Sequence, residues 1–428
     1  MATIVGVLGR RVWDSRGKAT VEAEVRLDDG SSGRAIAPAG ASTGAGEAKS
    51  IDASAAARAV NGEIAAALKG MDPADQAAVD RRLVELDGTP DKSRLGANAI
   101  VAVSLACAHA AAAAARQPLW QYLAAGRKVA LPVPQIQIFG GGAHARGRVD
   151  VQDYLLVCPG AGGFDEALEW TAQVYHAAGR RLAKRGQLQG VADEGGYWPT
   201  FKSNEEGLVE LVAAIEDAGL VPGTDCAIAL DVAATQLHRA GRYHLSLENR
   251  SLAPEQLQVM LGRWLERYPI VSIEDPVAED DVEAMVAFTK AFGRRVQVIG
   301  DDFFCTDVRR LQDGVARGAC NAVLLKPNQI GTVTETLACW DAARAAGYGA
   351  VVSARSGETE DVSIVHLAVG WGVPQLKVGS FARSERMAKW NEALRIEESL
   401  GGNALPFPAR RLYARTLQAG SRPDAARR

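Results

Sequence analysis

The sequence is poor in three features that would point to particular classes of protein. Its 48 Lys and Arg against 51 Asp and Glu leave a net charge of only −3, which gives no electrostatic reason to expect binding to nucleic acid or to an anionic membrane. The six cysteines are scattered and make no CxxC pair, which fits a reduced, cytoplasmic protein with packed thiols. The N-terminal stretch MATIVGVLGRRVWDSRG lacks the pattern of a secretory signal.

One uncharged segment is long enough to be mistaken for a membrane span. Residues 97–114, ANAIVAVSLACAHAAAAA, are mostly alanine and include Asn98, Ser104 and His109. Alanine is a strong helix former but only weakly apolar. We therefore predict a tightly packed helix of a soluble protein here and no membrane partner.

The pattern of polar and apolar residues divides the chain into two parts. In the first, TVEAEVRL (20–27) alternates like an antiparallel strand, and SGRAIAP follows it as a second strand. LPVPQIQIFGGG (131–142) marks a change, after which strands and helices alternate. We predict a small N-terminal α+β domain over residues 1–130 and a catalytic β/α domain over residues 131–428.

Several helices are predicted along the chain from these patterns. They cover residues 50–69, 73–86, 97–115, 204–218, 253–267, 280–292, 306–317, 332–346 and 360–370. The last twenty residues hold six arginines, and we interpret them as a solvated, frayed tail.

Six stretches of the second part share one pattern, an apolar run that stops at a charged or polar residue. Runs this short and this apolar suit strands that are buried on both faces of a parallel sheet. The C-terminal ends of such strands converge on one mouth of a barrel. We therefore predict one site built from the residues at which CAIALDVA, PIVSIEDP, VQVIGDD, AVLLKPN, GAVVSARSG and PQLKVGS change character: Asp231, Glu274, Asp301, Lys326, Arg355 and Lys377.

Three acids at neighbouring strand ends would repel one another unless a cation lay among them. Mg²⁺ takes oxygen ligands in proteins, so we predict Asp231, Glu274 and Asp301 as metal ligands. The alternative is that each acid caps the helix that follows it, which is common for one acid but not for three in register.

Two lysines are predicted at the same mouth. A lysine close to Mg²⁺ and to another cation has its charged form disfavoured, so its pKa falls and it becomes usable as a base. This reasoning applies to Lys326 and Lys377, which both follow apolar runs. An ion pair with the acids is an alternative that does not exclude the catalytic role.

Three further signals are weak when taken alone. DEGG (193–196) places Glu194 where a carboxyl group could act as general acid or base, although such sequences also make ordinary turns. GASTG (40–44) could close over a phosphate or a metal, or be a linker. His144, after three glycines, could donate to an anion or lie on the surface.

Taken in order, these motifs resemble those of the enolase (phosphopyruvate hydratase) family over nearly the whole chain. The resemblance implies a small N-terminal α+β domain, a C-terminal eight-stranded β/α barrel that opens with an irregular ββαα order, two Mg²⁺ ions and a homodimer or higher homo-oligomer. The matching motifs include DSRGKATVE (14–22), GASTG (40–44), DGTPDKSRLGANAI (87–100), GGAHA (141–145), DEGG (193–196), SIEDP (272–276), LLKPNQIGT (324–332) and RSGETED (355–361).

The resemblance also implies roles for single residues. Asp231, Glu274 and Asp301 match metal ligands. Lys326 matches the base that removes the proton from C2 of 2-phosphoglycerate, and Glu194 matches the acid that helps to expel the C3 hydroxyl. The remaining matches concern the substrate: Lys377 for its carboxylate, Arg355 and Ser356 for its phosphate, Ser42 for the second metal and His144 for a loop close to the substrate.

Two positions depart from the family pattern on the side of the leaving hydroxyl. Ala354 stands where enolases have His, and Asp153 stands where they have Glu, so the carboxyl group of this substrate-side residue is withdrawn by one methylene. Three functions stay open: dehydration of 2-phosphoglycerate, the same chemistry on a phosphonate analogue as in carboxyphosphonoenolpyruvate synthase, and a non-catalytic structural protein of the family. We expect the first, with a small phosphorylated or phosphonate acid as substrate.

Overall fold

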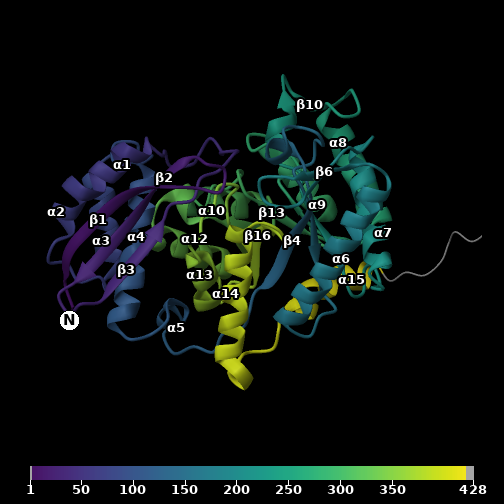
Figure 1. Ribbon diagram of the computed structural model, residues 1–428. Helices are drawn as coiled ribbons and strands as arrows, with labels where there is room; N and C mark the ends of the chain where they lie inside the picture. The colour runs from purple at the N-terminus through teal and green to yellow at the C-terminus, as the bar shows by residue number, and fades with distance from the viewer. Residues whose placement is uncertain (1, 421–428) are drawn as a thin grey trace, which may run out of the picture.

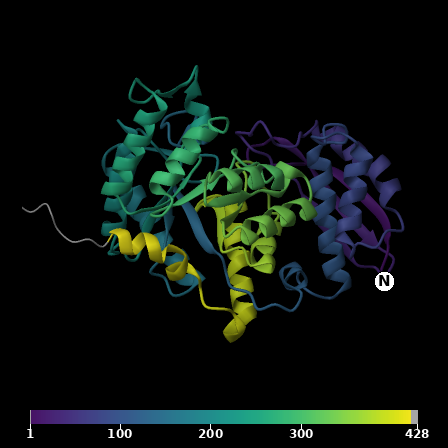
Figure 2. The same ribbon diagram turned by 180° about the vertical axis from the view of Figure 1, so that it is seen from behind.

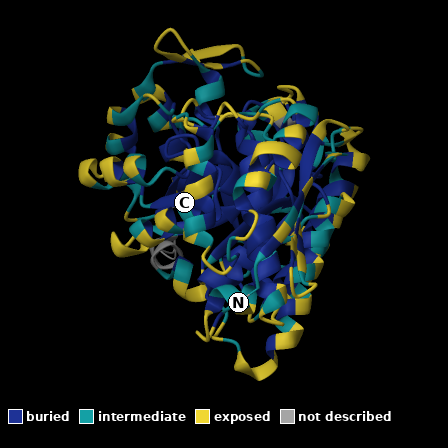
Figure 3. Ribbon diagram, turned by 90° about the vertical axis from the view of Figure 1, so that its left-hand side faces the viewer, coloured by how far each residue is buried: buried dark blue, intermediate teal, exposed yellow. Residues whose placement is uncertain are grey.

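The computed structural model describes residues 2–420, except for the side chains of His144 and of residues 415–420. A small sheet with its helices lies on one side of the molecule, and a larger barrel lies beside it (Figure 1). Buried residues fill the interior of both parts, whereas exposed residues lie on outer helices and loops (Figure 3). The predicted combination of a β/α barrel with a smaller α+β unit is therefore confirmed.

The small unit is an antiparallel three-stranded sheet covered by helices. Strands β1 (Ile4–Trp13), β2 (Ala19–Leu27) and β3 (Ser32–Ile36) pair in the order β1-β2-β3. The alternating sequence of β2 sends Val21, Ala23 and Val25 into the core. The helices that follow are α1 (Ala53–Ala59), α2 (Ala65–Leu68), α3 (Gln76–Asp87), α4 (Ala97–Ala114) and α5 (Leu119–Ala124), with a π-helical turn, Val60–Ile64, that joins α1 to α2.

Helix α4 packs closely on the sheet because its residues are small. A Cβ atom added to Gly33 of β3 would lie 2.3 Å from the carbonyl oxygen of Ala106, so only glycine at position 33 lets the helix backbone come this close. Among the described residues, α4 is the one helix whose length and composition would suit a membrane span, and 83% of it is buried inside the protein. This burial agrees with the predicted core helix.

The barrel has eight strands and closes on itself. Its order is β16-β15-β14-β13-β12-β8-β5-β4, and β16 pairs with β4 to complete the circle. All neighbouring strands are parallel except β5, which runs antiparallel to both β4 and β8. The strands are β4 (Val133–Gly140), β5 (Asp153–Val157), β8 (Ala227–Asp231), β12 (Ile270–Glu274), β13 (Gln297–Gly300), β14 (Ala322–Leu325), β15 (Gly349–Ser353) and β16 (Gln375–Ser380).

Two long helices stand between the second and third barrel strands. The chain runs β4, β5, α6 (Phe164–Lys184), α7 (Asn204–Asp217) and β8, which is the irregular ββαα opening implied by the family resemblance. The hairpin of β6 (Leu188–Val191) and β7 (Tyr197–Pro199) lies between α6 and α7. Later helices of the barrel are α8 (Pro254–Arg267), α9 (Val282–Phe292), α10 (Val308–Arg317), α11 (Pro327–Ile330), α12 (Val333–Ala345), α13 (Ser363–Trp371) and α14 (Ser384–Leu400), and a small sheet of β9 (His238–Arg239), β10 (Arg242–Leu245) and β11 (Arg250–Leu252) projects from it.

The prediction of a frayed C-terminal tail is wrong over residues 409–420. They form helix α15 (Ala409–Gly420), which lies near α6 on the side away from the small sheet (Figures 1 and 2). Ala409 and Tyr413 are buried against Val133, Leu155 and other strand residues at one end of the barrel. The many arginines of this segment suggested solvent exposure, although Ala409 and Tyr413 pack against the barrel. The rest of the predicted tail, residues 421–428, lies outside the described residues.

Candidate active site at the mouth of the barrel

The predicted acids and lysines do meet at one end of the barrel. Asp231 and Glu274 are the last residues of the adjacent strands β8 and β12 and lie opposite each other in register. Asp301 comes directly after β13, and Lys326 comes directly after β14. Because β5 runs the other way, its first residue, Asp153, also lies at this mouth and pairs in register with Asp231.

The ammonium group of Lys377 lies in the middle of the acids. Its Nζ atom is 2.8 Å from Asp231 Oδ2, 2.9 Å from Glu274 Oε2 and 3.3 Å from Asp153 Oδ2. All four side chains are buried. Because opposite charges at these distances attract one another strongly away from water, the ammonium group stabilises the ionised acids around it.

A second ion pair lies beside the first. Lys326 Nζ donates to Asp301 Oδ2, and Gln329 Nε2 donates to Asp301 Oδ1 at 2.9 Å. The backbone N–H of Lys326 and the side-chain oxygen of Gln329 both bond to the hydroxyl of Thr306. The base predicted from the sequence is thus fixed at both ends.

The pKa of Lys326 differs from the sequence expectation. Burial is the largest influence and lowers the pKa of Lys326, but the raising influences, with the charge of Asp301 first among them, exceed it in sum, and the net shift is upward. The predicted fall supposes Mg²⁺ beside the lysine and stays a prediction for the metal-bound site. Without the ion, the charge nearest to Lys326 is an anion. The ion pair given as the alternative is what the structure shows.

The acids fit a hard divalent cation by the chemistry of their donor atoms. Burial raises the pKa of Glu274 well above its usual value, and the neighbouring charge of Asp231 raises it further. The ammonium group between these two carboxylates shows that the site holds a positive charge. Buried carboxylate oxygens are the ligands that Mg²⁺ takes, so Asp231, Glu274 and Asp301 are suited to hold it.

A different trio of acids has the closest spacing in the described part of the chain. Oxygen atoms of Asp275, Asp301 and Asp302 lie within 4.8 Å of one another. The two oxygens of Asp275, however, accept the backbone N–H groups of Asp301 at 3.0 Å and of Asp302 at 2.9 Å. Asp275 therefore shapes the turn that presents Asp301. Burial, and after it the charge of Asp301, raises the pKa of Asp302 to about 7.

The predicted phosphate residues lie under the loop between β3 and α1. Arg355 donates to both carboxylate oxygens of Glu47, at 3.0 and 3.1 Å, and to the carbonyl oxygen of Ser42 at 3.0 Å. The hydroxyl of Ser356 accepts the backbone N–H of Ala41 at 2.7 Å. A Cβ atom at Gly40 would lie 2.0 Å from the Arg355 guanidinium, so only glycine allows the loop to come this close.

The remaining predicted residues share a narrow cavity with these groups. Its volume is about 20 Å³, which is room for little more than a water molecule, so a phosphorylated acid needs the loop or Lys377 to shift. Glu274 and Asp301 do not line it, but each pairs with a lysine that does. The side chain of His144 lies outside the described residues. Lining residues are Ser42, Gln152, Asp153, Glu194, Asp231, Lys326, Ser353, Ala354, Arg355, Ser356 and Lys377.

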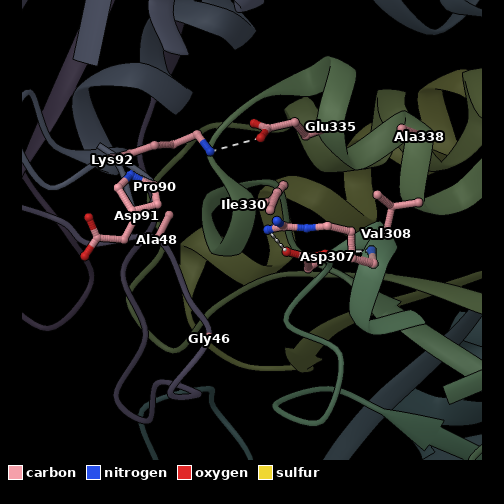
Figure 4. A pocket seen from close by; sticks show the side chains of 11 residues that line it. Gly46, Ala48, Pro90, Asp91, Lys92, Asp307, Val308, Ile330, Glu335 and Ala338 are labelled. Carbon is pink, nitrogen blue, oxygen red and sulfur yellow. Dashed lines mark hydrogen bonds and ion pairs between the residues drawn. The ribbon is translucent and has the colours of Figure 1, made fainter. Parts of the chain in front are cut away.

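A larger hollow of about 250 Å³ lies between the two parts of the molecule, away from this mouth. Lys92 reaches across it to Glu335, with Nζ and Oε1 3.0 Å apart (Figure 4). Asp307 on its other side pairs with Arg309 at 3.0 Å. These ions already satisfy one another, so the smaller cavity, where the acids and lysines converge, is the candidate active site.

Sequence reasoning missed the amides that orient the charged groups. Gln152 Nε2 donates to Asp231 Oδ2 at 2.9 Å, and its own oxygen accepts from Gln236 Nε2 at 2.8 Å. Gln329 holds Asp301, and Asn328 Oδ1 accepts from Arg355 at 3.2 Å. The position of Asn328 and Gln329 directly after Lys326 and Pro327 was the one available signal for two of them.

A closed β/α barrel with buried acids and lysines at the carboxyl ends of its strands defines a barrel enzyme with its chemistry at that mouth. Comparison with protein families gives matches to "Enolase, N-terminal domain" over residues 4–123 and to "Enolase, C-terminal TIM barrel domain" over residues 128–412. The chain is also 48% identical over 424 residues to Enolase 1 of Desulfitobacterium hafniense (strain Y51), which covers 96% of this chain and 97% of that protein.

The chain therefore belongs to the enolase family, and it is an enolase-type hydro-lyase. The third function left open by the sequence, a non-catalytic structural protein of the same family, is disfavoured by the 48% identity to Enolase 1 over nearly the whole chain.

Proposed function

We propose that the protein is a Mg²⁺-dependent lyase that dehydrates 2-phosphoglycerate, or a close analogue, to phosphoenolpyruvate through an enediolate. The observation that carries this proposal is that Lys326 and Lys377 line one cavity together with Arg355, and that the two lysines pair with Asp301 and with Asp231 and Glu274. Removing a proton next to a carboxylate makes a doubly negative group, which needs concentrated positive charge.

Lys326 is proposed as the base that takes the proton from C2. Its Nζ atom is held by Asp301 at the cavity wall, so its position is fixed before substrate enters. This assignment applies the known pattern of the enolase superfamily, in which a Lys or His base works beside one or two Mg²⁺ ions. Two Mg²⁺ ions, one of them held by Asp231, Glu274 and Asp301, would supply positive charge to the substrate carboxylate.

The other side chains are proposed to bind and orient the substrate. Lys377 would bind the carboxylate, and Arg355 with Ser356 would bind the phosphate. Glu47 fixes the guanidinium, whose Nε–H and the N–H groups now given to Asn328 and to the Ser42 carbonyl would serve the anion. Glu194, which lines the same cavity, would give a proton to the departing C3 hydroxyl. Ser42 of the loop would reach the second metal, and His144 would lie near the substrate.

One observation favours a second candidate substrate. Ala354 and Asp153 both line the cavity, and both carry less side chain on the leaving-group side than the family pattern has. The shorter side chains would leave more room for a bulkier group once substrate opens the cavity, such as that of a phosphonate analogue acted on by carboxyphosphonoenolpyruvate synthase-like enzymes.

Turnover of 2-phosphoglycerate measured beside that of a phosphonate analogue tests the substrate directly. With Mg²⁺ present, we expect phosphoenolpyruvate to form from 2-phosphoglycerate and the C2 proton to exchange with solvent. Absence of both, with turnover of the phosphonate analogue, would select the second candidate. Absence of Mg²⁺ binding and of all three reactions would defeat the proposed function.

We further propose that residues 1–130 and 131–428 act as the two domains of a cytoplasmic homodimer or higher homo-oligomer. The six free and buried thiols fit a reducing compartment. The mass in solution, measured by light scattering, tests the assembly, and a monomer at micromolar concentration would contradict it.

A further inference from the structure

Gln137 is a fully buried amide on β4 that the proposed function leaves without a role. Its Nε2 atom donates to Asp153 Oδ1, and its Oε1 atom accepts the backbone N–H of Gly196 at 2.8 Å. A carboxylate can only accept and an N–H can only donate. These partners therefore fix which end of the amide is nitrogen and which is oxygen.

Close packing also fixes the position of this amide. A Cβ atom at Gly196 would lie 2.4 Å from Gln137 Oε1, and one at Gly140 would lie 3.3 Å from Gln137 Nε2. The glycines on both sides thus leave room for the amide and for little else. A buried side chain confined in this way transmits position rather than adapting to it.

The two hydrogen bonds of Gln137 connect it to two acids that line the cavity. It bonds directly to Asp153, whose other carboxylate oxygen lies 3.3 Å from Lys377 Nζ. Gly196 ends the turn that carries Glu194. This turn is also held by Ser380, whose N–H donates to the carbonyl oxygen of Glu194 at 2.8 Å. Of these contacts, the bonds of Gln137 are the ones that join the turn to Asp153.

We propose that Gln137 is a positioning residue of the leaving-group side, and this proposal rests on the proposed dehydration. It sets the Asp153 carboxylate and the Glu194 turn at a fixed separation. In the step concerned, the C3–O bond breaks, its electron pair leaves with oxygen, and that oxygen takes the proton of Glu194 and departs as water. The electron pair left at C2 by the earlier proton loss forms the double bond to C3. Gln137 governs this step and not the removal of the C2 proton.

The test compares the two half-reactions in Gln137→Met, which keeps the volume of the side chain and removes both hydrogen bonds. We expect formation of the unsaturated product to fall roughly ten- to a hundredfold, as for a lost hydrogen bond to a charged group. The rate of exchange of the C2 proton with solvent, measured by isotope labelling, should stay within about twofold of wild type, since Lys326 is unchanged.

The matched control is Gln135→Met. Gln135 lies two residues earlier on the same strand, is equally buried, and donates to Gln375 Oε1 at 2.8 Å away from the cavity. This variant also loses a buried amide hydrogen bond, here to a neutral acceptor that does not line the cavity, so we expect its two half-reactions to keep their wild-type ratio. Equal losses in both half-reactions of Gln137→Met, as for a merely structural residue, would overturn the proposal.

A second variant and a structural measurement keep the test decisive. Gln137→Glu has the same shape and still accepts from Gly196, but it places an oxygen against Asp153 Oδ1. Crystal structures of Gln137→Glu and, if it folds, Gln137→Met should show the Asp153 carboxylate turned and the Glu194 turn displaced. Unmoved groups would refute the positioning role. Because this measurement needs no substrate, it is decided separately from any failure of wild-type dehydration.

Discussion

On strand β16, Gln375 and Lys377 lie two residues apart and face the same side, yet their surroundings differ completely. Lys377 lies among three carboxylates at the mouth. Gln375 meets neutral groups, with its Oε1 atom accepting from Gln135 Nε2 and from the hydroxyl of Tyr413, both at 2.8 Å. Strand β4 repeats the same change between Gln135 and Gln137.

The two ends of the barrel differ in what they bury: neutral groups at one end and charged groups at the other. The closed end, around Val133, Leu155 and Tyr413, is an apolar cluster with satisfied neutral amides. The mouth buries charges that are stable only as pairs, and breaking one pair leaves an uncompensated ion. Substitutions at the mouth should therefore change activity and ion binding, and also stability where they leave a charge unpaired, whereas those at the closed end should change stability alone.

Lys326→Ala is the change expected to break the mouth most severely. Without the proposed base, exchange of the C2 proton should fall roughly a hundred- to ten-thousandfold, the range for loss of a general base. Isotope exchange from labelled water measures it without requiring product release. Exchange that persists at the wild-type rate would remove Lys326 from this role.

Lys377→Met should destabilise the protein by about 3–5 kcal/mol in the absence of Mg²⁺, because Asp231 and Glu274 lose the cation between them. Urea unfolding of the variant and the wild type measures this difference. A loss no larger than that of a closed-end hydrogen bond would show that the two ends do not differ as described.

Addition of Mg²⁺ should stabilise the wild-type protein, by about 2.7 kcal/mol when the ion is in hundredfold excess over its Kd. Thermal unfolding with Mg²⁺ and after chelation measures the gain, which needs no substrate. Glu274→Gln should lose most of this gain, since it removes a ligand charge. An equal gain in that variant would place the ion elsewhere.

Ala354→His combined with Asp153→Glu sharpens the question of substrate. If the pocket has been respecialised, the double variant should dehydrate 2-phosphoglycerate roughly tenfold faster than wild type, while each single variant gains less. Steady-state turnover measures it. Fast dehydration by the wild-type protein, with no gain in the double variant, would leave the phosphonate alternative without support.

Tyr413→Phe should have the smallest effect, a loss of about 1 kcal/mol of unfolding free energy for one buried hydrogen bond. Turnover should stay at the wild-type value, because Tyr413 lies at the closed end. Chemical unfolding and an activity assay on the same sample measure both. A clear fall in turnover would contradict the separation of the two ends.

The barrel and its charged mouth were predictable because both depend on short-range patterns. A buried strand is a short apolar run, and the residue that ends it lies at a known edge of the sheet. The sequence alone therefore predicts that Asp231, Glu274 and Lys326 lie together. The ββαα opening was implied by the family resemblance alone.

The amides were not predictable because their roles depend on distant partners. Gln152 bonds to a residue 79 positions away, and Gln137 bonds to one 16 positions away. Nothing in a neutral amide indicates such a partner locally. The direction of the pKa shift of Lys326 also depends on which charges lie around its side chain, and a local pattern does not give these. Helix α15 was not predicted because the many arginines of this segment suggested a solvated tail, although Tyr413 packs against the barrel.

The bidentate pair between Arg355 and Glu47 has a consequence for how such enzymes can be recombined. The arginine follows a barrel strand, whereas its acid comes from the segment that leads out of the small sheet. If the barrel were joined to another N-terminal domain without an acid at this point, Arg355 would be left in the cavity without its carboxylate partner. The two domains should therefore be exchanged or redesigned together.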